Sequence, residues 1–385
     1  MKLALQLAYK NLMGAGLRTW LNVGVLAFSF IIIIFFRGFL EGWNQQAVRE
    51  NIEWELGYGH LINNDYDLYD PFSIQDGHGT LNVQNKENLT PILIRQASIY
   101  PDGRMLSVAL KGIDINQKIL KLPTESLSRD DSSIPVMIGK NMSISTGLKE
   151  GDNVLLRWRD KGGTFDATNI TVVKVFSTNA LTVDKGQIWI PIHKLWEMTG
   201  LQDHATLYVA NENYNHNEIK GWNYQTKDDL LSDFYEMMEM EKISSSFMYL
   251  LLLAIALLAI FDTQVLSVFR RQKEIGTYVA LGMTRTQVVG LFTVEGTMYS
   301  LFAMVVGCIV GFPIFWWLST KGIQLPDFYQ DMGITFPTRL FPVFGLQLII
   351  TTILLVVISA TIVSFIPARK ISKMNPVLAL KGKLQ

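Results

Sequence analysis

Four long apolar stretches stand out along a chain in which apolar and polar residues otherwise alternate over short distances. They cover residues 20–36, 247–269, 288–318 and 341–366, and the only charged residues inside them are Asp262 and Glu295. A helix needs about 20 predominantly apolar residues to cross about 30 Å of hydrocarbon, and soluble-core helices that are apolar on all sides are rarely this long. The pattern therefore predicts four transmembrane helices, at residues 20–40, 247–269, 288–318 and 341–366.

The segment between the first two of these helices, residues 41–246, is long enough to bury a core of its own. Its runs MLSVALKG, NVLLRWR, ITVVKVF and QIWIPI resemble strands, and IGKNMSISTG and PIHKLWEMTG have the length of short helices. This mixture favours an α+β fold over a β-sandwich. The predicted fold class is an α-helical membrane protein with four transmembrane helices and a large extracytoplasmic α+β domain between the first and second.

Charge is sorted along the chain although the formal net charge is zero. The arm at residues 1–19 carries three basic residues and no acid, the loop at 270–287 carries four basic residues and one acid, and the tail at 367–385 carries five basic residues and no acid. Short basic loops stay in the cytoplasm. We therefore expect a multi-pass protein of the bacterial inner (plasma) membrane with both termini cytoplasmic. The domain at 41–246 would lie in the periplasm, and the loop at 319–340 on the same side.

Several chemistries lack the residues that they require. Cys308 is the only cysteine, which excludes a disulfide or a cysteine-rich zinc site, and the five histidines are scattered without metal-ligand spacing. No GxxxxGK[ST] phosphate loop, catalytic triad or paired-carboxylate motif occurs in the sequence. We expect neither catalytic nor metal residues, no cofactor bound by this chain, and no binding to nucleic acid.

The loop between the second and third predicted membrane helices carries local signals of its own. Good helix formers run from Val268 to Ala280 and end at Leu281-Gly282, where glycine can supply a left-handed stop. Thr284 then offers an N-cap, with Gln287 in the capping-box position. The loop is predicted to form a helix, a glycine break and a second helix. It could rest on anionic lipid headgroups or dock on a protein, with Glu274, Ile275 and Leu281 as a charge and apolar anchors.

This loop resembles the signature loop of the MacB/FtsX superfamily of ABC-transporter permeases, whose pattern runs roughly E-R-x-x-E-I-G-x-x-x-A-L-G. The chain departs from it with Arg270 in place of the common glutamate and with Asp262 where an asparagine usually lies in the second span. Residues with the family's identity or next to it form the predicted ATPase-coupling set: Arg271, Glu274, Ile275, Gly276, Ala280, Leu281, Gly282, Thr284 and Arg285.

The resemblance extends over most of the chain. The opening KNLMGAGLRTWLNVGVLAFSF and the tail FIPARKISKMNPVLALKG are similar to the ends of the family's permeases. LKGID, PVMIGKNMSISTGLKEGDNVLL and KGIQLPDFYQDMGI resemble the lipoprotein-releasing, LolC/LolE-like branch. As a set, these segments are more specific than any one of them alone.

The resemblance implies a function. The loop would be a coupling helix seated in a groove of a separate cytoplasmic ABC ATPase dimer, which binds the ATP and Mg. Two permease subunits, identical or homologous, would transmit the motion through helical stalks at residues 37–56 and 226–246 and release a lipoprotein from the membrane. The alternatives are efflux of a drug or peptide through an outer-membrane partner, and an FtsX-like mechanical regulator of an envelope enzyme.

Three further groups of residues have two interpretations each. The apolar residues Phe35, Phe36, Phe39, Leu40 and Trp43 could contact an acylated substrate, or form an interfacial aromatic belt in contact with membrane lipid. The small residues Gly296, Ser300, Ala303, Gly307 and Gly311 predict a close helix approach, either by the fourth span or by the partner subunit. Glu295 could be functional or tie spans together, and Asp262 could snorkel or pair locally with Arg270.

Overall fold

The computed structural model describes residues 16–81, 86–128, 133–216, 218–324 and 339–374. These residues fall into two compact units. One is a helical unit, built from residues up to 43, 238–323 and 340 onward, and the other is a sheet domain, built mainly from residues 44–237. Each is described by itself.

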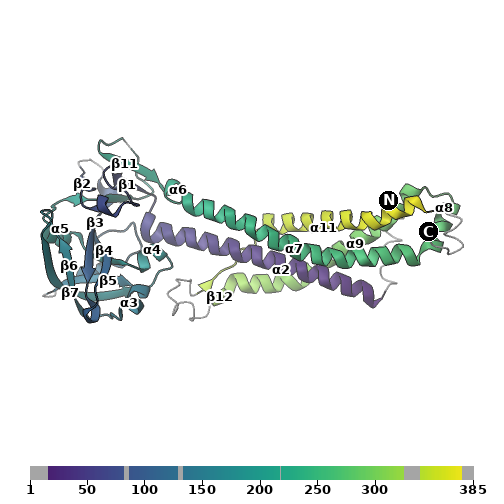
Figure 1. Ribbon diagram of the computed structural model, residues 1–385, viewed down its shortest axis with the longest axis horizontal. Helices are drawn as coiled ribbons and strands as arrows, with labels where there is room; N and C mark the ends of the chain where they lie inside the picture. Colours follow the sequence, from purple (N-terminus) through teal and green to yellow (C-terminus); the bar gives the residue numbers. More distant parts are fainter. Residues whose placement is uncertain (1–15, 82–85, 129–132, 217, 325–338, 375–385) are drawn as a thin grey trace. The chain divides into compact units, whose positions relative to one another are not determined.

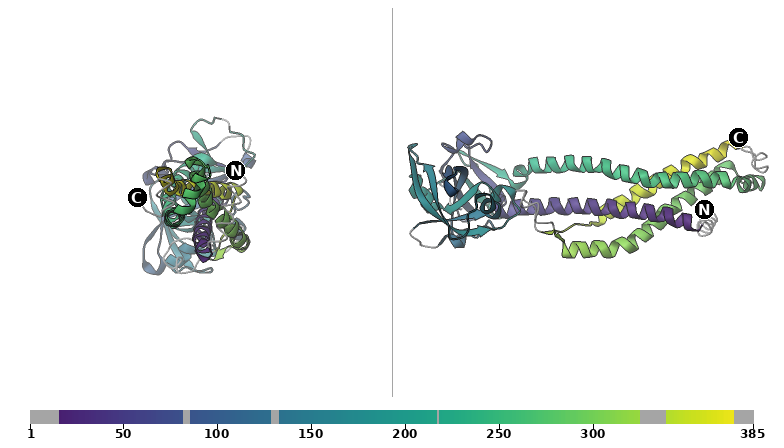
Figure 2. Two further views of the ribbon diagram at one scale, coloured as in Figure 1. Left: turned by 90° about the vertical axis from the view of Figure 1, so that its right-hand side faces the viewer. Right: turned by 60° about the horizontal axis from the view of Figure 1, so that its bottom comes forward.

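The helical unit consists mainly of four long helices that lie side by side (Figures 1 and 2). They are α2 (Leu17–Asn51), α7 (Ser232–Arg270), α9 (Arg285–Lys321) and α11 (Leu346–Ala368). All four are long and apolar enough to cross a membrane. Their outward faces carry exposed large apolar side chains such as Phe28, Leu258, Phe312 and Leu354, which suits a hydrocarbon environment. The prediction of four apolar membrane helices is confirmed to that extent.

Buried side chains from all four helices form one core in this unit. Leu26 and Phe30 of α2, Ile260 of α7, Tyr299 of α9 and Ala360 of α11 belong to it. The first turns of α2, the short helix α8 (Gln272–Ala280) and the short helix η6 (Arg369–Lys373) lie at the same end of this bundle (Figures 1 and 2). The basic segments therefore gather at one end, as the charge pattern requires.

Some helix bounds differ from those predicted. The fourth helix begins at Leu346 and not at 341, because Phe341 precedes a proline and Gly345 takes the N-cap position with extended backbone angles. The third helix continues to Lys321 in spite of Pro313. In the predicted loop at 319–340, the two-residue strands β12 (Ile323–Gln324) and β13 (Arg339–Leu340) pair with each other, and 325–338 lie outside the described residues.

A nine-stranded sheet dominates the sheet domain, with strand order β11-β1-β10-β3-β4-β8-β5-β7-β6. The strands are β1 (Gly59–Asn63), β3 (Leu89–Ile99), β4 (Leu106–Ile113), β5 (Ile134–Gly139), β6 (Asn153–Arg159), β7 (Phe165–Phe176), β8 (Gln187–Pro191), β10 (Leu207–Ala210) and β11 (Trp222–Thr226). The short strands β2 (Gly79–Thr80) and β9 (His204–Ala205) form a separate pair.

The long strand β3 closes part of this sheet into a barrel. Its residues 89–92 pair with β10, whereas residues 97–99 pair with β6, the last strand of the sheet order. Strands β3, β4, β8, β5, β7 and β6 therefore form a closed ring, and β10, β1 and β11 extend it as an open sheet. The interior follows the period-2 pattern of the sequence: in NVLLRWR, residues Val154, Leu156 and Trp158 are buried and their neighbours are exposed.

Short helices complete the sheet domain. They are η1 (Ile52–Leu56), α3 (Lys140–Thr146), α4 (Leu181–Asp184), α5 (Ile192–Thr199) and α6 (Lys227–Leu230), with single-turn segments η2 (Pro71–Ile74), η3 (Lys86–Asn88), η4 (Pro101–Gly103) and η5 (Thr124–Ser128). Helices α3 and α5 each end at a left-handed glycine, Gly147 and Gly200. The mixture of strands and helices agrees with the predicted α+β class.

Candidate functional site

The predicted coupling loop forms a compact structure that we call the α8 knob, residues 271–284. Helix α7 ends at Arg270, the backbone of Arg271 departs from helical geometry (φ −98°, ψ 21°), and α8 begins at Gln272. A continuous helix from Val268 to Ala280 was expected, and this expectation is wrong. The break coincides with the point where the Arg271 side chain binds carboxylates on α8 and α9.

The end of α8 follows the predicted glycine stop. Gly282 has a φ of +98°, and its N–H donates to the carbonyl of Val279 at 3.1 Å. The next N–H, of Met283, donates to the carbonyl of Tyr278 at 3.1 Å. These two bonds make a Schellman motif, which satisfies carbonyls that a helix end leaves unpaired.

The start of α9 carries the predicted capping box. The N–H of Gln287 donates to the Thr284 hydroxyl oxygen at 3.3 Å, and the N–H of Thr284 donates to Gln287 Oε1 at 2.9 Å. The helix, glycine break and capped helix predicted from the sequence are confirmed. Because both ends are fixed by local hydrogen bonds, the knob has a defined backbone path from α8 into α9.

One face of α8 is buried in the helical unit. Ile275 is only 2% exposed and packs with Val268, Val288, Phe292 and other residues in a small apolar core that also receives Ile371 of η6. The adjacent Gly276 is buried as well. The expectation that Ile275 offers an exposed apolar anchor is therefore wrong, because this side chain secures α8 to the bundle.

The opposite face of α8 is exposed and mainly polar. Leu281 is the exception, with 79% of its surface exposed. Of the predicted coupling set, the exposed members are Glu274, Ala280, Leu281, Gly282, Thr284 and Arg285, whereas Arg271 is intermediate and Ile275 and Gly276 are buried. Arg285 Nη1 also donates to the carbonyl of Ser372 in η6 at 2.9 Å, which connects the knob to the end of α11.

Arg271 fixes the knob to α9 through a buried ion pair. Its Nη1 lies 2.8 Å from Oε2 and 3.0 Å from Oε1 of Glu295, which is almost fully buried, and its Nε lies 2.7 Å from Oε2 of Glu274. The guanidinium also stacks over the Phe292 ring, 4.8 Å from its centroid. This geometry favours the structural interpretation of Glu295, which ties the α7–α8 junction to α9.

The small-residue stripe on α9 packs against other helices of the same chain. A Cβ on Gly296 would collide with the Ser364 hydroxyl of α11, and a Cβ on Gly307 would lie 2.7 Å from a ring carbon of Phe30 on α2. The rest of the stripe (Ser300, Ala303 and Gly311) is buried too. Intramolecular neighbours therefore account for the stripe.

The apolar residues near residue 40 and the acid Asp262 have different surroundings. Phe35 packs on the bundle core, Phe36 is exposed, and Phe39, Leu40 and Trp43 are half-buried. Asp262 is exposed on α7, and no ion pair joins it to Arg270 among the residues that the structure describes. Local pairing with Arg270, one of the two alternatives for Asp262, is not observed.

Sequence analysis missed a second close approach, on α2. Gly38 lies against the ring of Phe344, and Gly42 lies against the backbone at Phe341 and Pro342. The N–H of Val343 donates to the carbonyl of Gly38 at 2.9 Å. The signal was present as a small-xxx-small pair, Gly38 and Gly42, of the kind that lets helices approach closely.

The end of α2 is anchored in the sheet domain through η1. Trp54 stacks on Phe176 with centroids 5.7 Å apart, and Glu55 pairs with Lys111 of β4 at 3.3 Å and accepts a hydrogen bond from Thr182. Burial raises the pKa of Glu55, but Lys111 and Thr182 outweigh it and hold this pKa below its ordinary value. No sequence motif identified this network, because its members are far apart in the chain.

The histidines are less scattered in space than in the sequence. Nδ1 of His78 lies 2.9 Å from Nδ1 of His204, at the short sheet formed by β2 and β9. Within the described ranges, however, no group of three or more histidine, cysteine or carboxylate side chains could hold a metal ion.

Comparisons with known proteins address one part of the chain. Residues 246–376 match the family described as FtsX-like permease C-terminal. The chain is also similar to an uncharacterized ABC transporter permease of Methanocaldococcus jannaschii, with 24% identity over 131 residues, 34% of this chain. The matched segment spans 30% of that relative's length. These matches support a relationship to the ABC permease superfamily, and they do not bear on the lipoprotein-releasing branch.

Proposed function

We propose that this chain is the membrane subunit of an ABC transporter and that the α8 knob is the contact for a separate cytoplasmic ATPase dimer, which binds the ATP and Mg. An ABC permease in general works with an ATPase. The observation that carries the assignment is the division of α8 into a buried apolar face and an exposed face with Glu274 and Leu281. The knob is rigidly held from inside and offers its outer surface to a partner.

The same division argues against a helix that rests on lipid headgroups. Such a helix places its apolar face in the headgroup and acyl boundary. In α8 the apolar side chain of Ile275 is already buried within the protein, and the exposed face has charged and polar residues with Leu281 at its end. A single exposed leucine in a polar surround suits a protein contact, in which few apolar anchors carry much of the binding energy.

Force from the ATPase would pass along α2 and α7 as stiff helices. Helix α2 is continuous from Leu17 to Asn51 and leads into η1, whose Trp54 and Glu55 are bound to the sheet domain. Arg271 and Glu295 would keep the knob from moving independently of α9. ATP-driven displacement of the knob would thereby move the sheet domain.

The decisive test uses Leu281→Asp, which changes an exposed side chain without removing an internal contact. We expect loss of co-purification with an ATPase that carries a phosphate-binding loop, and loss of stimulated ATP turnover in reconstituted membranes. Glu274→Lys should act in the same direction, although it also removes the contact with Arg271. Glu239→Lys, an exposed charge reversal on α7 outside the knob, is the matched control. Normal coupling in Leu281→Asp would show that the knob is not the ATPase contact.

We further propose the topology in which the knob is cytoplasmic and the sheet domain is periplasmic in a bacterial inner membrane. Native Cys308 is exposed, so the test requires a Cys308→Ser background. Cysteines at Asp102 and Thr286 should then react oppositely with a membrane-impermeant reagent in intact cells. Labelling of both from outside would contradict the topology.

For the substrate we propose a lipoprotein released from the membrane, supported by resemblance of the sequence to the lipoprotein-releasing branch and by the exposed apolar side chain of Phe36. A second permease subunit, identical or homologous, would complete the transporter. Photo-crosslinkers at Phe36 and Trp43 should capture an acylated protein. Capture of phospholipid alone would instead assign these residues to an aromatic belt.

A further inference from the structure

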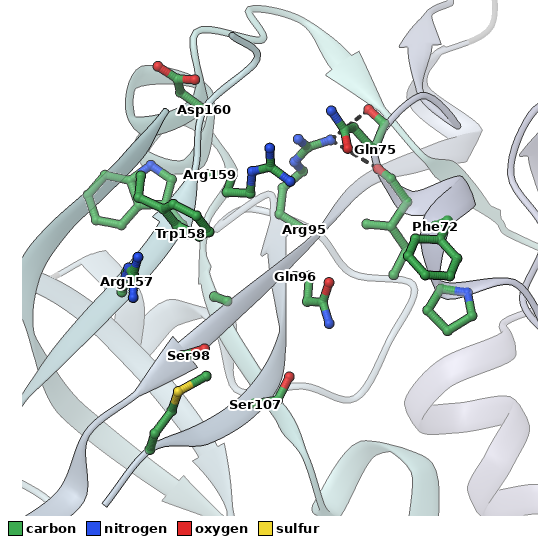
Figure 3. Close-up of a pocket in the computed structure, with 15 residues that line it drawn as sticks. Phe72, Gln75, Arg95, Gln96, Ser98, Ser107, Arg157, Trp158, Arg159 and Asp160 are labelled. Carbon is green, nitrogen blue, oxygen red and sulfur yellow. Dashed lines mark hydrogen bonds between the residues drawn. The ribbon is translucent and has the colours of Figure 1, made fainter. Parts of the chain in front are cut away.

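A cavity of about 340 Å³ opens in the sheet domain where β3 and β6 meet to close the barrel (Figure 3). The turn at η2, strands β3 and β6, the start of β4 and the first residue of β7 contribute to its lining. Its volume is at the lower end of the range for small-molecule sites, about 300–1,000 Å³. It shares no residue with the α8 knob.

Positive charge is concentrated in this cavity. Arg95, Arg157 and Arg159 line it, and the only acid in the lining is Asp160. Oδ1 of Asp160 already accepts the backbone N–H groups of Gly162 and Thr164, each at 2.8 Å. None of the three arginines forms an ion pair with a carboxylate in the described part of the chain. The cavity therefore has excess positive charge.

Arg95 is a buried cation, with 5% of its surface exposed. Its Nη1 donates to the backbone carbonyls of Ile74 and Gln75, at 3.0 and 3.1 Å, as Figure 3 shows. These two bonds orient the guanidinium, and the donors on its Nε and Nη2 make no hydrogen bond to another described residue. Burial lowers the pKa of Arg95, and nearby Arg159 lowers it further. Two neighbouring cations without a carboxylate are unfavourable unless an anion joins them.

The other two arginines are held by an aromatic ring. Arg157 and Arg159 occupy alternate, exposed positions of β6, and their guanidinium carbons lie 4.0 and 5.3 Å from the centroid of the Phe165 ring. Nε of Arg159 also donates to the carbonyl of Gly163 at 3.1 Å. Stacked guanidinium groups are oriented in advance, which reduces the entropy lost when they bind a carboxylate or phosphate.

Large apolar side chains surround the charged groups. Phe72 is 87% exposed, and Met105 and Phe165 are also mostly exposed. Isolated exposed apolar residues are common, but a group of them beside a cavity marks a binding surface. The combination of guanidinium groups and apolar side chains is complementary to a ligand with an anionic head and an apolar body.

We propose that this cavity binds an anionic amphiphile, a molecule with a carboxylate or phosphate group on an aliphatic chain. The anion accepts hydrogen bonds from Arg95, Arg157 and Arg159, and the chain lies against Phe72 and Met105. Guanidinium groups bind both kinds of anion in forked geometry. The proposal is independent of the function proposed for the α8 knob.

The test uses the full-length protein in nanodiscs of zwitterionic phosphatidylcholine and a photoreactive diazirine derivative of lauric acid. Mass spectrometry of peptides should locate saturable labelling in the segments that contain Phe72 and Met105. Unlabelled laurate and dodecyl phosphate should compete, and the stronger competitor identifies the preferred head group. Dodecanol, which lacks the charge, and acetate, which lacks the chain, should compete at least about tenfold more weakly, since hydrogen bonds to charged groups contribute about 1.5–3 kcal/mol.

The double variant Arg157→Gln/Arg159→Gln should reduce labelling of these segments at least about tenfold. Lys118→Gln/Lys185→Gln removes the same charge from exposed positions outside the cavity and should leave the labelling unchanged. Equal competition by dodecanol or acetate, labelling confined to the membrane helices, or full labelling of the arginine double variant would overturn the proposal. The competition series uses the unmodified protein, so it decides the question even if the variant folds poorly.

Discussion

Arg271 in the α8 knob and the arginines of the sheet-domain cavity have similar surroundings except for one feature. Arg271 stacks on Phe292, and Arg157 stacks on Phe165. Arg271, however, has two carboxylates within 3.0 Å of its nitrogens, whereas the cavity arginines form no ion pair among the described residues. The aromatic contact is common to both sites, and the acidic partner is present at only one of them.

This difference separates a structural cation from one available for binding. Glu274 and Glu295 neutralise Arg271 from within the chain, so its charge contributes to the position of α8 and not to recognition of a ligand. The cavity arginines keep their charge for a molecule from outside. Stability should therefore depend strongly on Arg271 and weakly on Arg157 and Arg159.

The largest effect is expected for Arg271→Met and Glu295→Met. Removal of one partner leaves the other buried without compensation, which costs about 3–5 kcal/mol of unfolding free energy. The double variant Arg271→Met/Glu295→Met removes both charges and should be more stable than either single variant. Unfolding of the purified protein in detergent, followed by tryptophan fluorescence, measures all three.

Glu274→Ala serves as the control for this series. Its carboxylate is half-exposed, and exposed ion pairs contribute about 1 kcal/mol or less. If Arg271→Met were no more destabilising than Glu274→Ala, the pair with Glu295 would not be the structural element that distinguishes the two sites.

His60 illustrates a third arrangement, in which a buried base remains neutral. Burial lowers its pKa to about 4, and Lys111 lowers it as well, although Glu55 acts in the opposite direction. The unfolded chain binds this proton near pH 6.5, so stability is fully present above pH 6.5 and falls as the pH drops towards 4. The loss over this window is about 3 kcal/mol. Denaturant unfolding between pH 7 and pH 4 measures it.

His60→Gln should flatten the curve over most of that window without abolishing the slope. His78 retains a lowered pKa from burial and contributes in the same direction, and Glu55 adds a further loss below pH 4.5. An unchanged slope in His60→Gln would mean that the pH dependence arises elsewhere.

Local signals in the sequence predicted much of this structure. The run NVLLRWR matches β6, PIHKLWEMTG contains α5, and the break at Gly282 and the cap at Thr284 occur where predicted. Each of these features depends on residues that are close in sequence. Helix caps and alternating strands carry their own physical causes, so they can be recognised without the fold.

Features that depend on distant residues were not predicted. The barrel closes because residues 97–99 of β3 pair with β6, some 60 residues later in the chain. Ile275 was expected on the surface because its neighbours are charged, but the packing of α8 against Val288 and Phe292 places it inside. The cavity arginines belong to two strands, and no spacing within either strand indicated that they would meet.

A smaller effect is expected at Gly282, which tests whether the knob depends on its backbone as well as on its ion pair. Gly282 has a φ of +98° and open space around it, so Gly282→Ala introduces backbone strain but no collision, at a cost of about 1 kcal/mol. Gly290→Ala in α9, also in open space but helical, should stabilise by up to about 1 kcal/mol. Opposite signs for these two matched substitutions in thermal unfolding would confirm the left-handed stop, and equal signs would contradict it.

The smallest effect is expected for Arg157→Gln and Arg159→Gln, and it tests the comparison from the other side. Both side chains are exposed, and neither makes an ion pair with a described residue, so each substitution should change the unfolding free energy by less than about 1 kcal/mol. Loss of the stacking on Phe165 destabilises slightly, whereas removal of like charge near Arg95 stabilises, and the two changes offset each other. Thermal unfolding beside Arg271→Met gives the contrast directly. A loss in Arg157→Gln as large as that in Arg271→Met would make the cavity arginines structural and would remove the reason to regard them as a binding site.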